Sequence, residues 1–291
     1  TSIVSSLESN SSLRSSLEPV YKAMKIGDSI HQEDRAMRYP SDVSDREWAE
    51  IERFFEPEHI GRPRKHPVRS LYNAIRYVER GGCQWRMLPK DFPPWRAVSM
   101  TFWRLRNAGT WEAINHHLRR QVRIKAGRHP DPTVAIMDSQ SVKTVQKGAG
   151  GYDAGKRIKG RKRHIVTDTQ GNLLTVVVHS CGISDSRGSH LVLLRLFILL
   201  PHLLKIFVDG GYKQGVIHWA KAMFGYCLEV IKRPDLSRFV VLPKHWIVER
   251  TFSWLIWHRR LSKDFEHAPK SSEAMVYIAS SSIMLRKLHP L

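Results

Sequence analysis

The sequence predicts an α/β protein in which an all-helical N-terminal part is followed by a mixed β-sheet flanked by helices. Two observations lead to this fold class. Apolar residues recur at helical spacing throughout residues 39–125, and the connections between these stretches are short. After "AGRHPDP", which begins at Ala126, short β-rich stretches appear and then alternate with apolar helical ones. A meander of strands followed by strand–helix alternation is typical of a mixed sheet with helices packed on it.

The composition indicates a globular protein with a polyanionic partner. The chain has 291 residues, 42% of them hydrophobic, and a formal net charge of +20 at pH 7. A positive charge of this size favours nucleic acid as the partner. A membrane is not expected, because no signal peptide opens the chain and the apolar "LVLLRLFILL" (191–200) is too short to span a bilayer. The three widely spaced cysteines form no CxxC pair, which favours a reduced, cytoplasmic protein without zinc or disulfides.

The helical part is predicted from capping signals and apolar stripes. Ser44 and Glu47 form a capping box at the start of the first helix. Pro67 suits the first turn of the next helix, and the pair Gly81-Gly82 stops it. The remaining helical stretches are "CQWRML" before Pro89, the apolar stripe from Trp95 to Leu105, and the helix that Thr110 caps after Gly109.

The second part is predicted to contain four strands and three helices. The predicted strands are Val134 to Met137, His164 to Asp168, Leu173 to His179 and Lys205 to Val208, and "DTQGN" (168–172) is a hairpin turn. The predicted helices are Ser189 to Leu200, Gln214 to Phe224 and Trp246 to about Leu261. We therefore expect a flexible Ser-rich extension over residues 1–36, a helical domain over 37–128 and an α/β domain over 129–291.

Two acids follow predicted strands directly, and a third lies on a predicted helix. Asp138 follows one apolar strand, and Asp209 follows another before two glycines that permit a tight exit. Ligand sites of open α/β sheets form at the carboxyl ends of strands. On the last predicted helix, Glu249 shares a face with Phe252 and Ile256, so it is expected to face the sheet. Each acid alone has an ordinary interpretation as a turn residue, a cap or an ion-pair partner; the conjunction favours a site.

Three carboxylates at one point would repel one another and raise each other's pKa values unless a cation is present. Oxygen ligands with no nearby His or Cys favour Mg²⁺, with Mn²⁺ as a substitute, over zinc. Two such ions about 3.5–4 Å apart support in-line phosphoryl displacement. A basic chain with an acidic triad therefore predicts metal-dependent cleavage or transfer of nucleic-acid phosphodiesters.

Long motifs in the sequence resemble bacterial insertion-sequence transposases. The motifs are "YPSDVSDREWAEIE", "GRPRKH", "GCQWRMLPKDFPPWRAV", "IMDSQSVKT", "GYDAGKRIKGRKRHIVTDTQGN", "VDGGY" and "VVLPKHWIVERTFSWLIWHRRLSKDFE". They are similar to the DDE group of the insertion-sequence-five type over about residues 38 to 288. The resemblance implies a ribonuclease-H-like catalytic domain in which Asp138, Asp209 and Glu249 are the metal-binding catalytic triad. Glu266, in "SKDFE", is the nearest competitor for the third role, and we set it aside because its surroundings look exposed.

The sequence departs from the family pattern in two places. The basic pair expected before the tryptophan of the last motif is Lys244-His245, so the arginine expected four residues before Glu249 is a histidine. We expect Lys244, His245 and the neighbouring Arg250 to contact DNA phosphates. The extension before Met37 is also foreign to the pattern, and Met24 or Met37 is the expected natural start.

Two cationic segments are predicted to contact DNA. "KRIKGRKR" has six cations in eight residues, and its position between two strands of the α/β part favours phosphate binding over a merely solvated loop. "GRPRK" resembles Arg-Pro segments that lie in narrow minor grooves, with a basic interhelical loop as the alternative. The cations concerned are Lys156, Arg157, Lys159, Arg161, Lys162 and Arg163 in the first segment and Arg62, Arg64 and Lys65 in the second.

The two helices around Pro89 to Pro94 could form a helix-turn-helix. On the second of them, Arg96, Arg104 and Asn107 lie opposite the apolar stripe, where Arg could read guanine and Asn could read adenine. An ordinary amphipathic helix in a bundle is the alternative. Trp254 and Trp257 could stack on bases, with core or dimer packing as the favoured interpretation.

The sequence therefore predicts a transposase that binds the terminal inverted repeats of an insertion sequence as a homodimer on DNA. It would cut and join DNA strands with two divalent ions and act in the cytoplasm, associated with the nucleoid. Two alternatives stay open: a structure-selective nuclease that never joins strands, and a non-catalytic DNA-binding repressor derived from a decayed copy.

Overall fold

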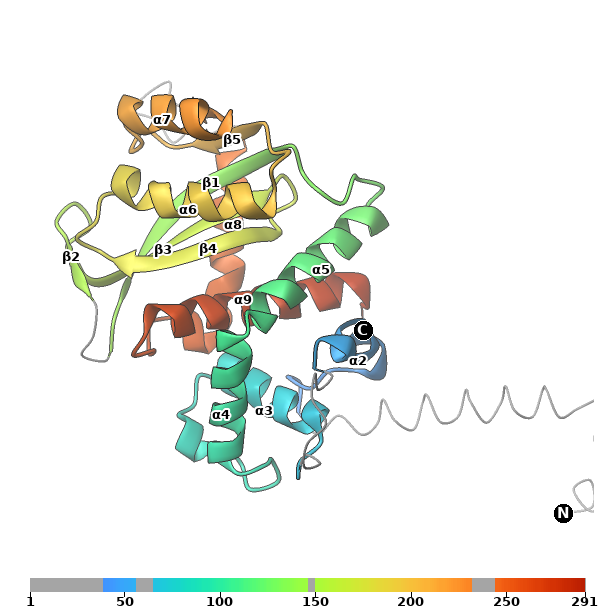
Figure 1. Ribbon diagram of the computed structural model, residues 1–291. Helices are drawn as coiled ribbons and strands as arrows, with labels where there is room; N and C mark the ends of the chain where they lie inside the picture. The colour runs from blue at the N-terminus through green and yellow to red at the C-terminus, as the bar shows by residue number, and fades with distance from the viewer. Residues whose placement is uncertain (1–38, 56–64, 146–149, 232–243, 291) are drawn as a thin grey trace, which may run out of the picture.

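The computed structural model describes residues 39–55, 65–145, 150–231 and 244–290, which form a mixed sheet flanked by helices above a helical N-terminal part (Figure 1). The N-terminal elements are α2 (Asp45–Ile51), η1 (Glu52–Phe55), α3 (Val68–Gly81), η2 (Trp85–Met87), α4 (Trp95–Asn107) and α5 (Thr110–Lys125). The strands are β1 (Val134–Lys143), β2 (Gly151–Asp153), β3 (Ile158–Asp168), β4 (Leu173–Ser180), β5 (Lys205–Val208) and β6 (Cys227–Val230). The later helices are α6 (Asp185–Leu199), α7 (Gln214–Phe224), α8 (His245–Ile256), η3 (Arg259–Leu261) and α9 (Pro269–Leu288).

The sheet is mixed, as the sequence predicts. Its strands follow the order β2-β3-β1-β5-β6, with β4 also paired to β3. The β1–β3 and β3–β4 pairs are antiparallel, whereas β1–β5 and β5–β6 are parallel. A long antiparallel meander therefore joins a short parallel unit along β1, the strand that carries Asp138.

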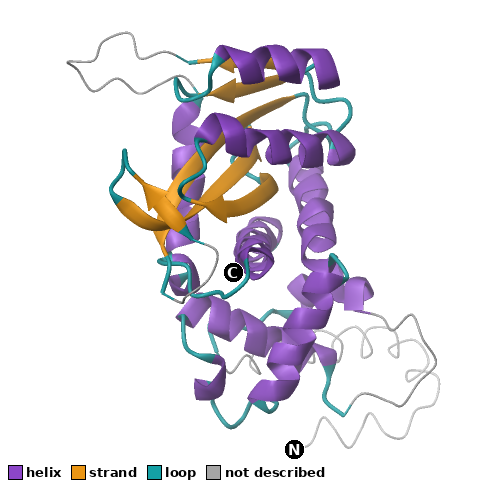
Figure 2. Cartoon of the chain, turned by 60° about the vertical axis from the view of Figure 1, so that its left-hand side comes forward, coloured by secondary structure: helices purple, strands orange, loops and turns teal. Residues whose placement is uncertain are grey.

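Helices cover both faces of the sheet (Figure 2). Residues alternate between the faces along β1: Ala135 and Met137 pack in a core with α6 and α7, and Ile136 packs in a second core with α8 and α9. Because the side-chain period of a strand is two, Asp138 lies on the α8 face with Ile136.

The core on the α8 face continues into the helical N-terminal part. It joins Ile136 and Ile165 of the sheet to residues of α2, α3, α4 and α5, with α9 in between. In Figure 1, α9 runs between the sheet and the lower helices, and α5 reaches up from these helices beside it. The predicted boundary between residues 128 and 129 stays a prediction, and the described helices on its two sides share one core.

Several predicted elements are confirmed. The Ser44 hydroxyl oxygen accepts a hydrogen bond from the Glu47 backbone N–H, and the Glu47 carboxylate accepts one from the Ser44 backbone N–H, so the capping box forms. Gly82 ends α3 in the left-handed conformation at φ 75°, where a glycine is favoured. Strand β5 and helix α7 have the predicted bounds.

Other elements differ from the prediction. Strands β1 and β3 are longer than predicted, and β2, β6 and α9 were not predicted at all. α9 was not predicted because its sequence carries no amphipathic stripe. The helix is buried on nearly every side, and its serines are buried as well. The predicted flexible extension over residues 1–36 lies outside the described residues. None of the described helices is long and apolar enough to cross a membrane.

A buried ion pair links the helical part to the sheet. Arg123 Nη1 of α5 donates to Asp168 Oδ2 at 2.8 Å, and the Asp168 side chain is fully buried. Asp168 also accepts hydrogen bonds from the backbone of Gln170 and from Asn172, so it organises the β3–β4 turn.

Replacing Asp168 with Ala should lower the free energy of unfolding by about 3–5 kcal/mol, because Arg123 would stay buried without its partner. Urea denaturation measures the loss. The control is Glu229→Ala, which removes an exposed ion pair with Lys205 and should cost less than about 1 kcal/mol. Equal losses in the two variants would contradict the structural role given to Asp168.

Candidate active site

The parallel pairing of β1 with β5 brings two acids together. Ile136 lies opposite Phe207 in this ladder, so two residues further on Asp138 lies opposite Asp209. Neighbouring strands are about 4.8 Å apart, and equivalent positions of a parallel pair point to the same face. The prediction that Asp138 directly follows its strand is wrong. It lies within β1, at the point where the shorter β5 ends. The two carboxylates therefore share one edge of the α8 face.

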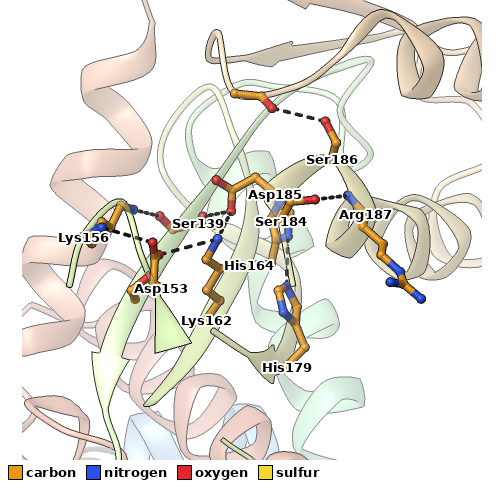
Figure 3. Close-up of polar contacts among 12 residues, drawn as sticks. Ser139, Asp153, Lys156, Lys162, His164, His179, Ser184, Asp185, Ser186 and Arg187 are labelled. Carbon is orange, nitrogen blue, oxygen red and sulfur yellow. Dashed lines mark hydrogen bonds and ion pairs between the residues drawn. The ribbon is translucent and has the colours of Figure 1, made fainter. Parts of the chain in front are cut away.

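The loop after β5 is shaped around Asp209. The backbone N–H of Gly211 donates to Asp209 Oδ1 at 3.0 Å. A Cβ on Gly211 would lie only 3.1 Å from that oxygen, so the position favours glycine. On the other side, Ser186 Oγ of α6 donates to the Gly211 carbonyl and accepts from the Lys213 backbone at 2.7 Å. Ser186 therefore ties this loop to the start of α6 (Figure 3).

Asp138 has a perturbed acidity. Its pKa is raised to about 6, chiefly by burial and also by the neighbouring Asp209, against lowering effects from His245 and the Ser139 backbone. The Ser139 N–H donates to Asp138 Oδ1 at 2.6 Å. A carboxyl group in this state is stabilised in its charged form by a cation placed between it and Asp209.

Glu249 reaches this edge differently from the prediction. Its side chain is 62% exposed and does not pack against the sheet with Phe252. A buried histidine stands between it and β1: His245 Nδ1 is 3.4 Å from Glu249 Oε1, and His245 Nε2 is 3.9 Å from Asp138 Oδ2. Neither ring nitrogen makes a hydrogen bond within the described residues. The i, i+4 spacing of His245 and Glu249 is the signal that could have revealed this contact.

The residues present fit a hard divalent cation in part. Two carboxylates on adjacent strands, one with a raised pKa, are suitable oxygen donors for Mg²⁺ or Mn²⁺. In the part of the chain that the structure describes, however, no three His, Cys, Asp or Glu side chains are grouped closely enough to hold a metal ion. Asp138 and Asp209 are thus brought together, and Glu249 lies one side chain away from them.

Polar side chains on the opposite face of the sheet support the same edge (Figure 3). Asp185, in the first turn of α6, accepts from Ser139 Oγ at 2.6 Å and from Lys162 Nζ at 3.0 Å. Lys162 Nζ also lies 3.6 Å from Asp153 Oδ2. Since Ser139 follows Asp138 directly, this network fixes the backbone on which Asp138 sits. This network was not predicted from the sequence.

A buried chain of rings lies beside this network. His164 Nε2 is 2.5 Å from Tyr212 Oη, and His164 Nδ1 is 3.5 Å from His179 Nε2. Burial lowers the pKa of His164 to about 3, and the nearby His179 lowers it as well. His164 is therefore neutral in the folded protein throughout the physiological pH range.

The cationic segment from Lys156 to Arg163 is not the single surface that we predicted. It lies largely in β3, and its last three cations are buried. Arg161 pairs with Asp264 at 3.1 Å, Arg163 donates to the Leu261 carbonyl at 2.5 Å, and Lys162 joins the network above. The reason is the strand itself, which places these residues alternately under α9 and under α6. The exposed members are Lys156, Arg157 and Lys159.

The three basic residues near Glu249 that are predicted to contact DNA have different environments. Lys244 is exposed, with its ammonium 4.5 Å from the Phe207 ring centroid. His245 is buried, so it is not a surface phosphate contact in this conformation. Arg250 lies between the rings of Trp246 and Trp254, at 4.6 and 4.5 Å from their centroids, and donates to the Gln170 carbonyl. The Arg250 guanidinium therefore packs between two indoles and donates within the protein, instead of facing the solvent.

The predicted reading face of α4 is exposed, as expected. Arg96, Arg104 and Asn107 are all exposed, opposite the buried Val98 and Phe102. In the predicted minor-groove segment, Lys65 is exposed, whereas Arg62 and Arg64 lie outside the described residues.

Glu266 was set aside for a wrong reason. It is 9% exposed and pairs with Arg260 Nε at 2.8 Å, so it is buried and not, as we expected, at the surface. It nevertheless stays a poor competitor for Glu249, because its carboxylate is already neutralised by this arginine.

Comparisons with known proteins agree with the two parts of the chain. A family model described as "Transposase DDE domain" matches residues 129–284, which contain the whole sheet. A second, described as "Putative transposase of IS4/5 family", matches residues 43–115 in the helical part. No curated protein and no solved structure matches the chain.

Replacing His164 with Gln should reduce acid sensitivity. The folded pKa of His164 is depressed from 6.5, so its contribution to stability is present above pH 6.5 and is lost as pH falls towards 3. The free energy of unfolding of the wild type should therefore fall more steeply between pH 6 and 4, by up to about 1.4 kcal/mol per pH unit. Denaturation at several pH values measures the slope, with the exposed His218→Gln as the control. The charged or titrating groups around His164 are His179, Tyr212, Asp185, Lys162 and Lys156. Parallel pH profiles for wild type and His164→Gln would contradict this account.

Replacing Arg161 with Met should lower the free energy of unfolding by about 3–5 kcal/mol, because Asp264 would stay buried without its cation. The exposed Lys159, two residues earlier in the same segment, provides the matched control: Lys159→Ala should change stability by less than about 0.5 kcal/mol. Thermal or urea denaturation measures both. Similar effects would show that the two cations have the same environment, against the structure.

Proposed function

Because the chain belongs to the transposase DDE domain family, of the IS4/5 type, we propose that it binds the terminal inverted repeats of an insertion sequence and cuts and joins DNA strands there. The family implies a ribonuclease-H-like sheet for residues 129–284. The observation that carries the catalytic part of the proposal is the placement of Asp138 beside Asp209 where β5 ends.

We propose that Asp138 and Asp209 hold Mg²⁺, or Mn²⁺ as a substitute, and that Glu249 completes the ligand set. Two bound ions would activate the attacking oxygen and stabilise the leaving oxygen of a phosphodiester. The residues of the chain supply the arrangement. The Ser139 and Gly211 amides each hold one carboxylate oxygen of the pair, and the Ser186 hydroxyl fixes the loop that carries Asp209.

His245 is proposed to set the position of Glu249. In the described arrangement it lies between Glu249 and Asp138, with both ring nitrogens without a hydrogen bond. A small rotation of the exposed Glu249 side chain would release it from His245 and let it approach the aspartates. The His245 ring occupies the position where the family pattern has an arginine.

We propose that DNA lies along the exposed cations. The face of α4 that carries Arg96, Arg104 and Asn107 would enter a major groove and read the repeat, with Lys65, Arg62 and Arg64 beside it in a minor groove. Lys156, Arg157, Lys159 and Lys244 would bind phosphates nearer to the aspartates. Joining two ends requires two active sites, so the working form would be a homodimer on DNA.

One observation favours a second candidate, a non-catalytic DNA-binding repressor. The described residues contain no group of three side chains arranged as a metal site, and a histidine separates Glu249 from the other two acids. A repressor would bind the element ends without cutting them in Mg²⁺ or Mn²⁺. A nuclease that cuts but never joins is the third candidate.

Asp138→Asn, Asp209→Asn and Glu249→Gln should each reduce cleavage of DNA carrying the element ends by at least about 1,000-fold in Mg²⁺ while leaving DNA affinity intact, because each removes one ligand charge and keeps the side-chain shape. Gel assays of nicked and joined products measure this, and the exposed Glu229→Gln is the control.

The products distinguish the candidates. Wild type that transfers a 3′-hydroxyl end into a second duplex supports a transposase, and cleavage alone supports a nuclease. Full activity of any of the three variants would remove that residue from the site. Tight binding without any cleavage by the wild type would favour the repressor.

A further inference from the structure

We propose that a cleft between α3 and the C-terminal ends of α8 and α9 binds an unpaired DNA strand next to the active site. The cleft has a volume of about 820 Å³, none of the three proposed catalytic acids lines it, and none of the contacts proposed above uses it. Four cations and two tryptophans are among the residues that line it: Arg76, Arg80, Arg286, Lys287, Trp254 and Trp257.

The cleft carries a surplus of positive charge. Its four cations face two carboxylates: Glu79 in the wall, which is 2.6 Å from His258 Nδ1, and Glu47 behind it. Glu47 is shared, because Arg76 Nη1 is 3.9 Å and Arg286 Nε is 3.2 Å from its oxygens. A chain of phosphates is the ligand that such an arrangement complements.

One arginine of the cleft is free to bind a ligand. Arg80 is exposed and has no ion-pair partner in the described parts of the chain. Arg76 also lines the cleft, but its Nη1 is buried and lies 3.9 Å from Glu47 Oε2. Arg80 is therefore the cation whose guanidinium can donate to a phosphate oxygen in the cleft.

The tryptophans indicate bases as well as phosphates. Trp257 is 73% exposed, the largest exposed fraction of any described aromatic side chain, and within the described residues no ring or cation covers it. The Trp254 ring, in contrast, already has two cation–π contacts: the Arg250 guanidinium lies 4.5 Å and the Lys287 ammonium 4.9 Å from its centroid. An open indole face beside cations is the arrangement with which proteins bind unpaired strands, because each base can stack on it.

The cleft lies within reach of the cutting site. α8 carries Glu249, and Trp257, eight residues later, is the C-cap of the same helix, which corresponds to about 12 Å along the helix axis. That is three to four nucleotide steps at about 3.4 Å per step. This proposal rests on the proposed function in one respect, the identity of the ligand as DNA. An end frayed or freed by cutting would thus have its unpaired nucleotides on Trp257.

Binding of the full chain to a fluorescent oligothymidylate 15-mer and to a blunt mixed-sequence duplex tests the proposal by anisotropy. Trp257→Ala should weaken binding to the single strand by about 5- to 100-fold, the worth of one stacked base, and change binding to the duplex less than twofold. Trp257→Phe, which keeps a ring, should restore most of the affinity. Ile198→Ala, which truncates a side chain of equal exposure (73%) on α6, is the control.

The salt dependence tests the cations. Arg80→Ala should reduce the slope of log affinity against log salt for the single strand by about 0.7, the contribution of one phosphate. Single-strand affinity of Trp257→Ala within twofold of wild type would overturn the proposal. An equal loss for the duplex would also overturn it, since the cleft would then not select unpaired bases.

Cleavage assays on the same variants separate this proposal from the proposed function. If wild type cuts element ends and Trp257→Ala binds the single strand normally, the cleft proposal fails and the function stands. If wild type binds the single strand through Trp257 yet never cuts DNA in Mg²⁺ or Mn²⁺, the cleft proposal stands and the catalytic function fails.

Discussion

The parallel pairing of the long β1 with the short β5 is the constraint on which the site depends. It sets Asp138 and Asp209 at equivalent positions one strand apart, where burial, together with the nearby charge of Asp209, raises the pKa of Asp138 to about 6. The protein offsets this cost locally, with backbone amides on both carboxylates and with a network behind the sheet that includes Ser139 and Asp185. A cation bound between the two carboxylates would relieve the repulsion between them and favour their charged forms.

Much of the fold was predictable because its signals are local. The capping box at Ser44, the glycine stop of α3 and the bounds of β5 and α7 depend on residues a few positions apart. The extended β3 was not predictable in this way. Six cations in eight residues are typical of a solvated loop, and the groups that bind Arg161 and Arg163 lie about 100 residues later in the chain. α9 likewise depends on surroundings that only the folded protein supplies.

For the candidate site, the sequence predicts which residues are involved but not how their side chains lie. The apolar stretches before Asp138 and Asp209, together with the family motifs, point to these two acids and to Glu249 as candidates. What the sequence does not specify is side-chain direction. The burial of His245, the exposure of Glu249 and the packing of Arg250 between two indoles follow from how α8 rotates on the sheet. A one-dimensional pattern leaves that rotation undetermined.

The common core of α2–α5, α9 and the sheet has a consequence for how a cut would be located. If α4 reads a repeat, the described helices between it and β1 would hold it at a fixed distance from the carboxylates, because α9 packs against both the sheet and these helices. The packing of the protein core would then fix the number of base pairs between the recognised repeat and the bond that is cut. If the repeat were shifted by a single base pair, the phosphodiester would no longer lie at the carboxylates.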